Sequence, residues 1–204
     1  MAAATTETTG RVMIFNDKDI QWFYIKPMYK RDWKIKDYFD KKHCDTYIPM
    51  HEIYRETEGK PVKVSVPLIS SMLFVRTSWE MLKEEKMNLD ALGMPFMLRM
   101  DSMHQSKPIV IPDKVMENFK RVCADEYSRY IDNRVKLDKI KKGNYVEVID
   151  GKWKGLQGFY ARPWKDKCVV VAIEGVCAVC TTYLPPAFLK IIDKPKNVNV
   201  PNNL

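Results

Sequence analysis

The chain has 204 residues and a net charge of +8, and 46% of its residues are hydrophobic while 29% are charged. This composition is typical of a folded globular protein and excludes a wholly disordered chain. No run of 18 apolar residues occurs, which excludes a membrane-spanning helix. The five cysteines lack the spacing of a disulfide framework, so we expect a cytoplasmic protein. The basic balance suits a polyanionic partner.

Residues 1–42 are predicted to form a tail, a strand and a helix. Small and threonine-rich residues without an apolar signal segment predict a disordered tail over 1–19. The aromatic and β-branched run 21–25 then predicts a strand that ends at Pro27. From 29 to 42, apolar residues at helical spacing among lysines and aspartates predict a helix with a charged outer face; the apolar positions are Trp33, Ile35, Tyr38 and Phe39.

The next part of the chain alternates between strand and helix signals. Four strands are predicted, at 44–50, 64–68, 72–75 and 96–100. The polar stretch 55–63, which carries Gly59-Lys60-Pro61, predicts a turn or a mobile loop. Ser78 predicts the cap of a helix that reaches about residue 86, and Pro112 opens an amphipathic helix that reaches Cys123. Helices packed on an antiparallel sheet, an α+β layer, are therefore expected over 20–124.

The pattern changes after residue 124. The charged segment 125–140 has few aliphatic residues and is predicted to be a linker. Short strands with glycine punctuation then predict a small β-barrel over 141–193, followed by a polar tail over 194–204. The strands of this barrel are expected at 145–149, 157–161, 168–173 and 176–183.

A glycine-rich segment from 143 to 158 carries the strongest signal. Val146 and Val148 alternate as one buried face of a strand. Asp150 and Gly151 form a turn dipeptide whose glycine can take a positive φ. The returning strand can bend and approach closely at its glycines. The residues of this motif are Gly143, Val146, Val148, Gly151, Gly155 and Gly158.

This segment resembles a KOW motif, the opening of the SH3-like barrel of NusG proteins and of some ribosomal proteins. A generic hairpin in an unrelated barrel is the alternative. The preceding part resembles a NusG N-terminal domain, because the strand Trp22-Phe23-Tyr24-Ile25, then Pro49, then the segment 67–75 follow the family's order. The resemblance covers roughly residues 21–192. It is nearest to specialised paralogs such as RfaH and the UpxY-type antiterminators of capsular polysaccharide loci.

The resemblance implies a transcription elongation or antitermination factor that is not an enzyme. Its N-terminal domain is expected to bind the clamp helices of the RNA polymerase β′ subunit through an apolar concavity. The residues at matching positions are Trp22, Tyr47, Ile69, Met72 and Phe74. Met72 and Phe74 are two apart on a strand and therefore share a face. The alternative is that these side chains are core.

Two further surfaces follow from the resemblance. The family's first helix region contacts the non-template DNA strand, so a basic surface here is expected to bind that strand or nascent RNA. Its residues are Lys26, Lys30, Arg31 and Lys34; a solvated charged face is the alternative. The KOW domain is expected to bind Rho or a small-subunit ribosomal protein. We expect a monomer without a cofactor or a membrane contact. The alternative function is a ribosome-associated KOW protein that binds structured RNA.

Two residue pairs could indicate a metal site or a catalytic site. Cys177 and Cys180 form a C-x-x-C, but residues three apart on a strand face opposite sides, and the histidines are far away in sequence. His43 and Cys44 are adjacent, a spacing that rarely sets a base on a nucleophile. We therefore expect neither a metal site nor catalysis.

Overall fold

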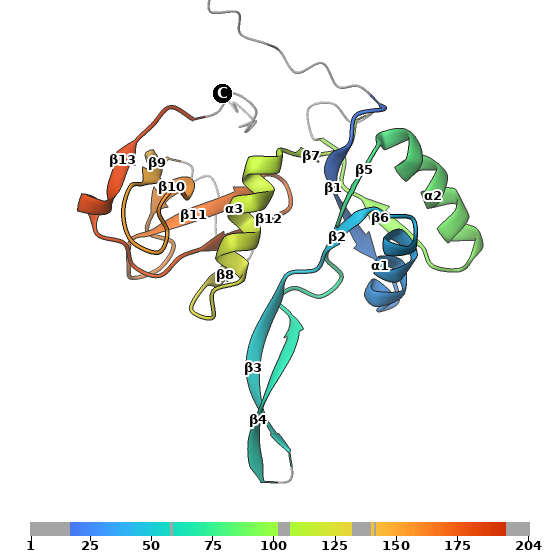
Figure 1. Ribbon diagram of the computed structural model, residues 1–204, viewed down its shortest axis with the longest axis horizontal. Coiled ribbons are helices and arrows are strands. Elements are labelled where there is room, and N and C mark those ends of the chain that lie inside the picture. Colours follow the sequence, from blue (N-terminus) through green and yellow to red (C-terminus); the bar gives the residue numbers. More distant parts are fainter. Residues whose placement is uncertain (1–16, 58, 102–106, 132–139, 141, 195–204) are drawn as a thin grey trace, which may run out of the picture.

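The computed structural model in Figure 1 describes residues 17–57, 59–101, 107–131, 140 and 142–194. Most of the two predicted tails, and residues 132–139 of the predicted linker, lie outside this range. Among the described helices, none combines the length and the apolar character that crossing a bilayer requires.

Five strands form the N-terminal sheet, and all of their pairings are antiparallel. The central strand β1 (Gln21–Pro27) pairs on one side with β5 (Leu73–Thr77), which pairs in turn with β2 (Asp45–Tyr47). On its other side β1 pairs with both β6 (Phe96–Leu98) and β7 (Val110–Ile111). The predicted antiparallel sheet is confirmed.

Two helices cover one face of this sheet. The helix α1 (Asp32–Lys41) buries Ile35 and Phe39, and α2 (Trp79–Ala91) buries Leu82 and Leu89, in one cluster with Phe23, Ile25, Leu73 and Val75 of the sheet. The predicted cap is confirmed, because the Ser78 hydroxyl accepts a hydrogen bond from the Met81 backbone N–H at 3.2 Å. The predicted third helix is also confirmed as α3 (Asp113–Cys123), which lies on the opposite face of the sheet (Figure 1).

A long hairpin contains the segment 55–63, for which a turn or a mobile loop is predicted. Its strands, β3 (Met50–Thr57) and β4 (Lys60–Pro67), pair from Met50↔Pro67 to Thr57↔Lys60 and turn at Gly59, which has a φ of 75°. The predicted turn is therefore confirmed at Gly59, whereas the alternative of a mobile loop was wrong because charged residues of 55–63 occupy paired strand positions that face solvent. The hairpin projects away from the rest of the molecule (Figure 1).

Six strands form the C-terminal sheet, in the order β13-β9-β10-β11-β12-β8. They are β8 (Arg129–Ile131), β9 (Tyr145–Val148), β10 (Gln157–Ala161), β11 (Cys168–Ile173), β12 (Cys177–Cys180) and β13 (Leu189–Ile191), with a short 3-10 helix η1 (Pro186–Phe188) before the last. Four of the six match predicted strands. The linker prediction over 125–140 was wrong at β8, because Ile131 is fully buried and its backbone pairs with Ala178.

Candidate partner-binding surfaces

The helix α3 lies between the two sheets, and one of its sides packs on the N-terminal sheet (Figure 1). The Phe119 ring meets the ring of Phe74 with centroids 5.4 Å apart, and the ring of Tyr47 with centroids 6.5 Å apart. The ammonium of Lys120 lies 4.0 Å from the centroid of the Trp22 ring and 5.2 Å from that of Tyr47. These are aromatic and cation–π contacts, which are strongest where water is excluded.

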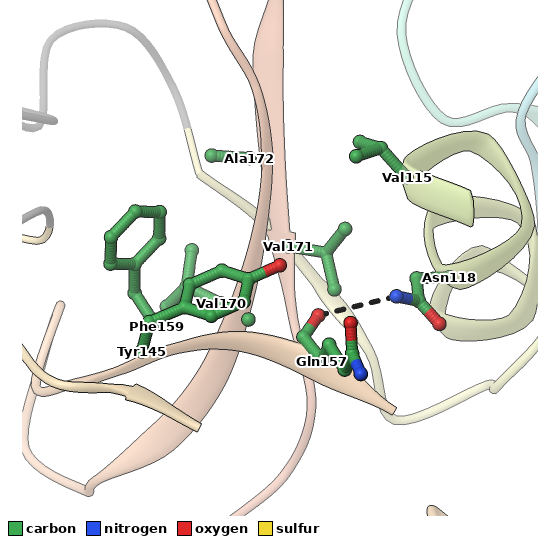
Figure 2. Close-up of a pocket in the computed structure, with 9 residues that line it drawn as sticks. Val115, Asn118, Tyr145, Gln157, Phe159, Val170, Val171 and Ala172 are labelled. Carbon is green, nitrogen blue, oxygen red and sulfur yellow. Dashed lines mark hydrogen bonds between the residues drawn. The ribbon is translucent and has the colours of Figure 1, made fainter. Parts of the chain in front are cut away.

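The other side of α3 packs on the C-terminal sheet. Figure 2 shows Asn118 donating a hydrogen bond to the backbone carbonyl of Gln157, at 3.4 Å. The Arg121 guanidinium donates to the carbonyls of Lys152 and Lys154. A small pocket lies beside this contact; it is lined by Val115, Asn118, Tyr145, Gln157, Gly158, Phe159, Val170, Val171 and Ala172. The two sheets therefore share one helix as their common packing partner.

The apolar residues predicted to bind a helical partner lie beneath α3. Met72 and Phe74 do share a face, as predicted, and their side chains are 3% and 0% exposed. Trp22 is 5% exposed, while Tyr47 and Ile69 are half-buried at the margin of the same cluster. Trp22, Met72 and Phe74 are therefore core residues in this conformation, which is the alternative given for them above, and α3 covers them.

Burial shifts the pKa values of the ionisable groups around α3. It raises the pKa of Tyr24 to about 12 and that of Cys123 to about 12, and burial together with the neighbouring Cys123 raises the pKa of Tyr47. Burial also lowers the pKa of Lys120. At neutral pH the tyrosines and the thiol are uncharged, and Lys120 supplies a positive charge to this contact.

The residues of the predicted basic surface lie just before α1 and in its first turn. Lys26, Lys30 and Lys34 are exposed, and none of the three forms an ion pair with a carboxylate among the described residues. Arg31 is half-buried, and its guanidinium donates to the carbonyl of Gly93. Three of the four predicted cations are therefore free to meet an anion, whereas Arg31 also holds the start of α1 to the end of α2.

Two aromatic side chains on this surface were missed by sequence reasoning. Tyr29 and Trp33 are 73% and 49% exposed beside the three lysines. Tyr29 and Lys30 both have a φ of 56°, a left-handed conformation that is uncommon outside glycine and holds the tyrosine outward. Trp33 was predicted as an inward apolar position of the helix, but Ile35 and Phe39 form the buried side of α1.

The glycine-rich segment forms the turn that was predicted for it. Val146 and Val148 are buried on one face of β9, and Gly151 and Gly155 have φ values of 75° and 81°. A Cβ on Gly158 would lie 2.5 Å from the carbonyl oxygen of Val170, and one on Gly143 would meet the carbonyl oxygen of Tyr160. These glycines therefore shape the C-terminal sheet and its first turn rather than a binding surface.

Cys177 and Cys180 are buried packing residues, and Cys44 is partly buried. Cys177 lies in the cluster beneath α3, while Cys180 lies in the cluster on the other face of the sheet, so the prediction of opposite faces is confirmed. Burial raises the pKa of Cys177 and that of Cys44, which keeps both thiols protonated at neutral pH. Within the described ranges, no three metal-ligating side chains of the His, Cys, Asp or Glu type come together.

Residues 20–120 match a family model described as transcription termination factor NusG. The match begins one residue before β1 and ends within α3, so it spans the N-terminal sheet, the hairpin and the first two helices. A comparison with curated protein sequences gives no match.

Proposed function

Because residues 20–120 form a NusG-family domain, we propose that this chain is a transcription elongation or antitermination factor that binds RNA polymerase. The family match carries this proposal, and the antiparallel sheet with its covering helices is consistent with it. The mechanism is binding without chemistry: a factor that binds the closed, elongating polymerase more tightly than the open form shifts the enzyme toward elongation.

The polymerase contact is proposed at Trp22, Tyr47, Ile69, Met72 and Phe74, with the β′ clamp helices as the ligand. In support, these side chains form one apolar cluster with several rings, the kind of surface into which an amphipathic helix packs. The ligand that covers this cluster in the present conformation is itself an amphipathic helix, α3. A polymerase helix would take the place of Phe119 on Phe74. Apparent affinity is then reduced by the fraction of molecules in which α3 remains closed.

The nucleic-acid contact is proposed at Lys26, Lys30, Arg31 and Lys34, with the non-template DNA strand as the ligand. Free lysine ammonium groups attract phosphates, and the exposed rings of Tyr29 and Trp33 offer stacking surfaces for unpaired bases. This combination favours single-stranded DNA over a plain solvated face.

The C-terminal sheet is proposed to be a KOW domain with an SH3-like barrel form. Its support is the glycine turn between β9 and β10 and the short antiparallel strands that follow. Rho or a small-subunit ribosomal protein is the proposed partner of this domain.

The test is binding of the purified full chain to an isolated β′ clamp-helix fragment. Ile69→Asp places a charge at the half-buried margin of the apolar cluster and should weaken binding at least 10-fold. Ile191→Asp on β13 is the matched control, because Ile191 is 67% exposed on the far sheet. Substitutions at Met72 or Phe74 would damage the core, so they are not informative. Equal affinities of the two variants would refute the contact, and co-sedimentation with ribosomal subunits in its place would favour the alternative of a ribosome-associated protein.

A further inference from the structure

One end of the C-terminal sheet collects exposed rings and cations from three separate segments. These are the start of β8, the turn between β10 and β11, and the segment that follows β12. Their exposed side chains, here named the stacking end, are Arg129, Arg162, Trp164, Lys165, Lys167 and Tyr183.

Backbone contacts hold the three segments together. Arg129 pairs with Cys180 across β8 and β12, and Ala161 pairs with Cys168 across the base of the turn. The backbone N–H of Leu184 donates to the carbonyl of Lys167 at 3.3 Å. The Tyr160 hydroxyl donates to the carbonyl of Leu184 at 3.0 Å. The residues of the stacking end are therefore positioned by the sheet itself.

The rings of this surface are open to solvent and bordered by cations. Trp164 is 42% exposed and Tyr183 is 57% exposed. The Arg129 guanidinium lies 5.9 Å from the centroid of the Trp164 ring, and the Lys167 ammonium lies 5.3 Å from that of Tyr160. Both rings are therefore accessible to a ligand, and a cation already lies beside the Trp164 ring.

The cations of this surface have no salt-bridge partner among the carboxylates that the structure describes. Its four basic side chains face one acidic side chain in the same segments, Asp166. By contrast, Lys83, Lys86 and Lys152 elsewhere on the surface each pair with an aspartate.

We propose that the stacking end binds single-stranded RNA, with bases stacked on Trp164 and Tyr183 and phosphates held by the four surrounding cations. Stacking on aromatic side chains combined with cations along a backbone is how proteins hold single strands without reading their sequence. Both rings are accessible, and bases that are unpaired can reach them, whereas the bases of a duplex are already stacked. The choice of RNA over DNA rests on the proposed function, because a factor that travels with polymerase stays beside the emerging transcript.

The experiment measures fluorescence anisotropy of a labelled oligoadenylate RNA of about 12 nucleotides with the full chain. The double variant Trp164→Ala, Tyr183→Ala should weaken binding about 10-fold or more. The double variant Lys165→Gln, Lys167→Gln should weaken it and reduce the slope of log affinity against log salt by about 0.7 for each lost phosphate contact. Tyr54→Ala on the hairpin, where the ring is 74% exposed, is the matched control and should bind as the parent does.

Other ligands and one variant test whether the stacking end binds RNA specifically. The assignment to RNA would be overturned by tighter binding of the matching oligodeoxyadenylate, or of an acidic polyglutamate peptide, if that binding is also lost in the Trp164→Ala, Tyr183→Ala variant. DNA binding that this variant retains belongs to the basic surface at Lys26, Lys30 and Lys34. Unchanged RNA binding by the Trp164→Ala, Tyr183→Ala variant would overturn the assignment to this surface. All of these variants change exposed residues, so their melting temperatures should match the parent.

The inference and the proposed function fail separately. A chain that binds the clamp-helix fragment but not the RNA refutes the stacking end and leaves the polymerase contact standing. A chain that binds the RNA through Trp164 and Tyr183 but not the clamp helices refutes the polymerase contact and leaves a single-strand binding surface.

Discussion

Phe119 of α3 packs against Phe74 of β5 with ring centroids 5.4 Å apart and an angle of 63° between the ring planes. Both side chains are fully buried. This edge-to-face pair fastens the helix to the N-terminal sheet at the place where a polymerase helix is proposed to bind. Weakening the contact between α3 and this sheet should therefore change both the free energy of unfolding and the affinity for the clamp-helix fragment. The two quantities can be measured separately.

The Phe119→Ala substitution should lower the free energy of unfolding by about 3 to 5 kcal/mol, because it leaves a cavity where two rings were in contact. Urea unfolding followed by circular dichroism measures the change. Tyr54→Ala, at a ring that is 74% exposed, should change stability by no more than about 0.5 kcal/mol. A loss below about 1 kcal/mol for Phe119→Ala would show that α3 packs loosely on this sheet.

The Lys120→Glu substitution should strengthen binding of the clamp-helix fragment several-fold. The ammonium lies over the Trp22 and Tyr47 rings, whose faces repel a carboxylate in its place. Asp45 and Asp113 add to this repulsion, and Arg76, which pairs with both aspartates, offsets part of it. The closed position of α3 then becomes less favourable. Isothermal titration calorimetry of the full chain measures the affinity.

Lys114→Glu is the control for this prediction, because Lys114 is an exposed residue of the same helix that pairs only with Glu117 among the described carboxylates. Unchanged or weaker binding by Lys120→Glu would contradict a competition between α3 and the polymerase helices.

The carboxylate of Glu85 should make stability depend on acid pH. It is 3% exposed and accepts hydrogen bonds from Lys42, from the Tyr38 hydroxyl at 2.6 Å and from Asn88 at 3.1 Å. Burial opposes its ionisation, but the hydrogen bonds from Lys42 and Tyr38 outweigh burial and lower its pKa. Since the folded pKa lies below the unfolded pKa, the contribution is complete above about pH 4.3 and is lost as pH falls through the folded pKa.

Glu85→Gln removes this titration. The variant should be less stable than the parent at pH 7, and the difference should be smaller at pH 3, as measured by urea unfolding at each pH. Glu84→Gln, an exposed neighbour on α2, should follow the parent at both pH values. A constant difference between Glu85→Gln and the parent across this range would rule out the linkage.

Two glycines of the C-terminal sheet should respond differently to alanine. Gly158→Ala places a Cβ 2.5 Å from a backbone oxygen, so the strands β10 and β11 must separate, at about 1 to 3 kcal/mol or more. Gly155→Ala meets nothing within 4 Å, and only its φ of 81° opposes a side chain, at about 1 to 2 kcal/mol. Thermal unfolding of the two variants should give the larger loss for Gly158→Ala, and the reverse order would contradict this account.

Local signals in the sequence were sufficient for several elements. The helix α3 was placed at its observed bounds because its apolar residues recur at helical spacing after Pro112. The strands β10 and β11 were placed at their observed bounds because glycine and charged turns border runs of β-branched and aromatic residues. The turn glycines followed from the positive φ that such turns require.

Other features depend on contacts between distant residues, which one sequence does not display. The arms of the β3–β4 hairpin carry charges on exposed positions, and the charged neighbours of Ile131 concealed β8. The apolar character of Met72 and Phe74 was evident, but the helix that covers them lies about 40 residues further on. The sequence therefore predicted an apolar surface, but only the fold shows that α3 covers it.

The position of α3 between the two sheets has a consequence for how the chain melts. Each sheet loses part of its apolar cover when the helix detaches, so neither can unfold without raising the energy of the other. Differential scanning calorimetry should therefore record a single endotherm, as expected for one cooperative unit rather than two independent modules. A substitution that destabilises β11 would then also destabilise β1 in the other sheet.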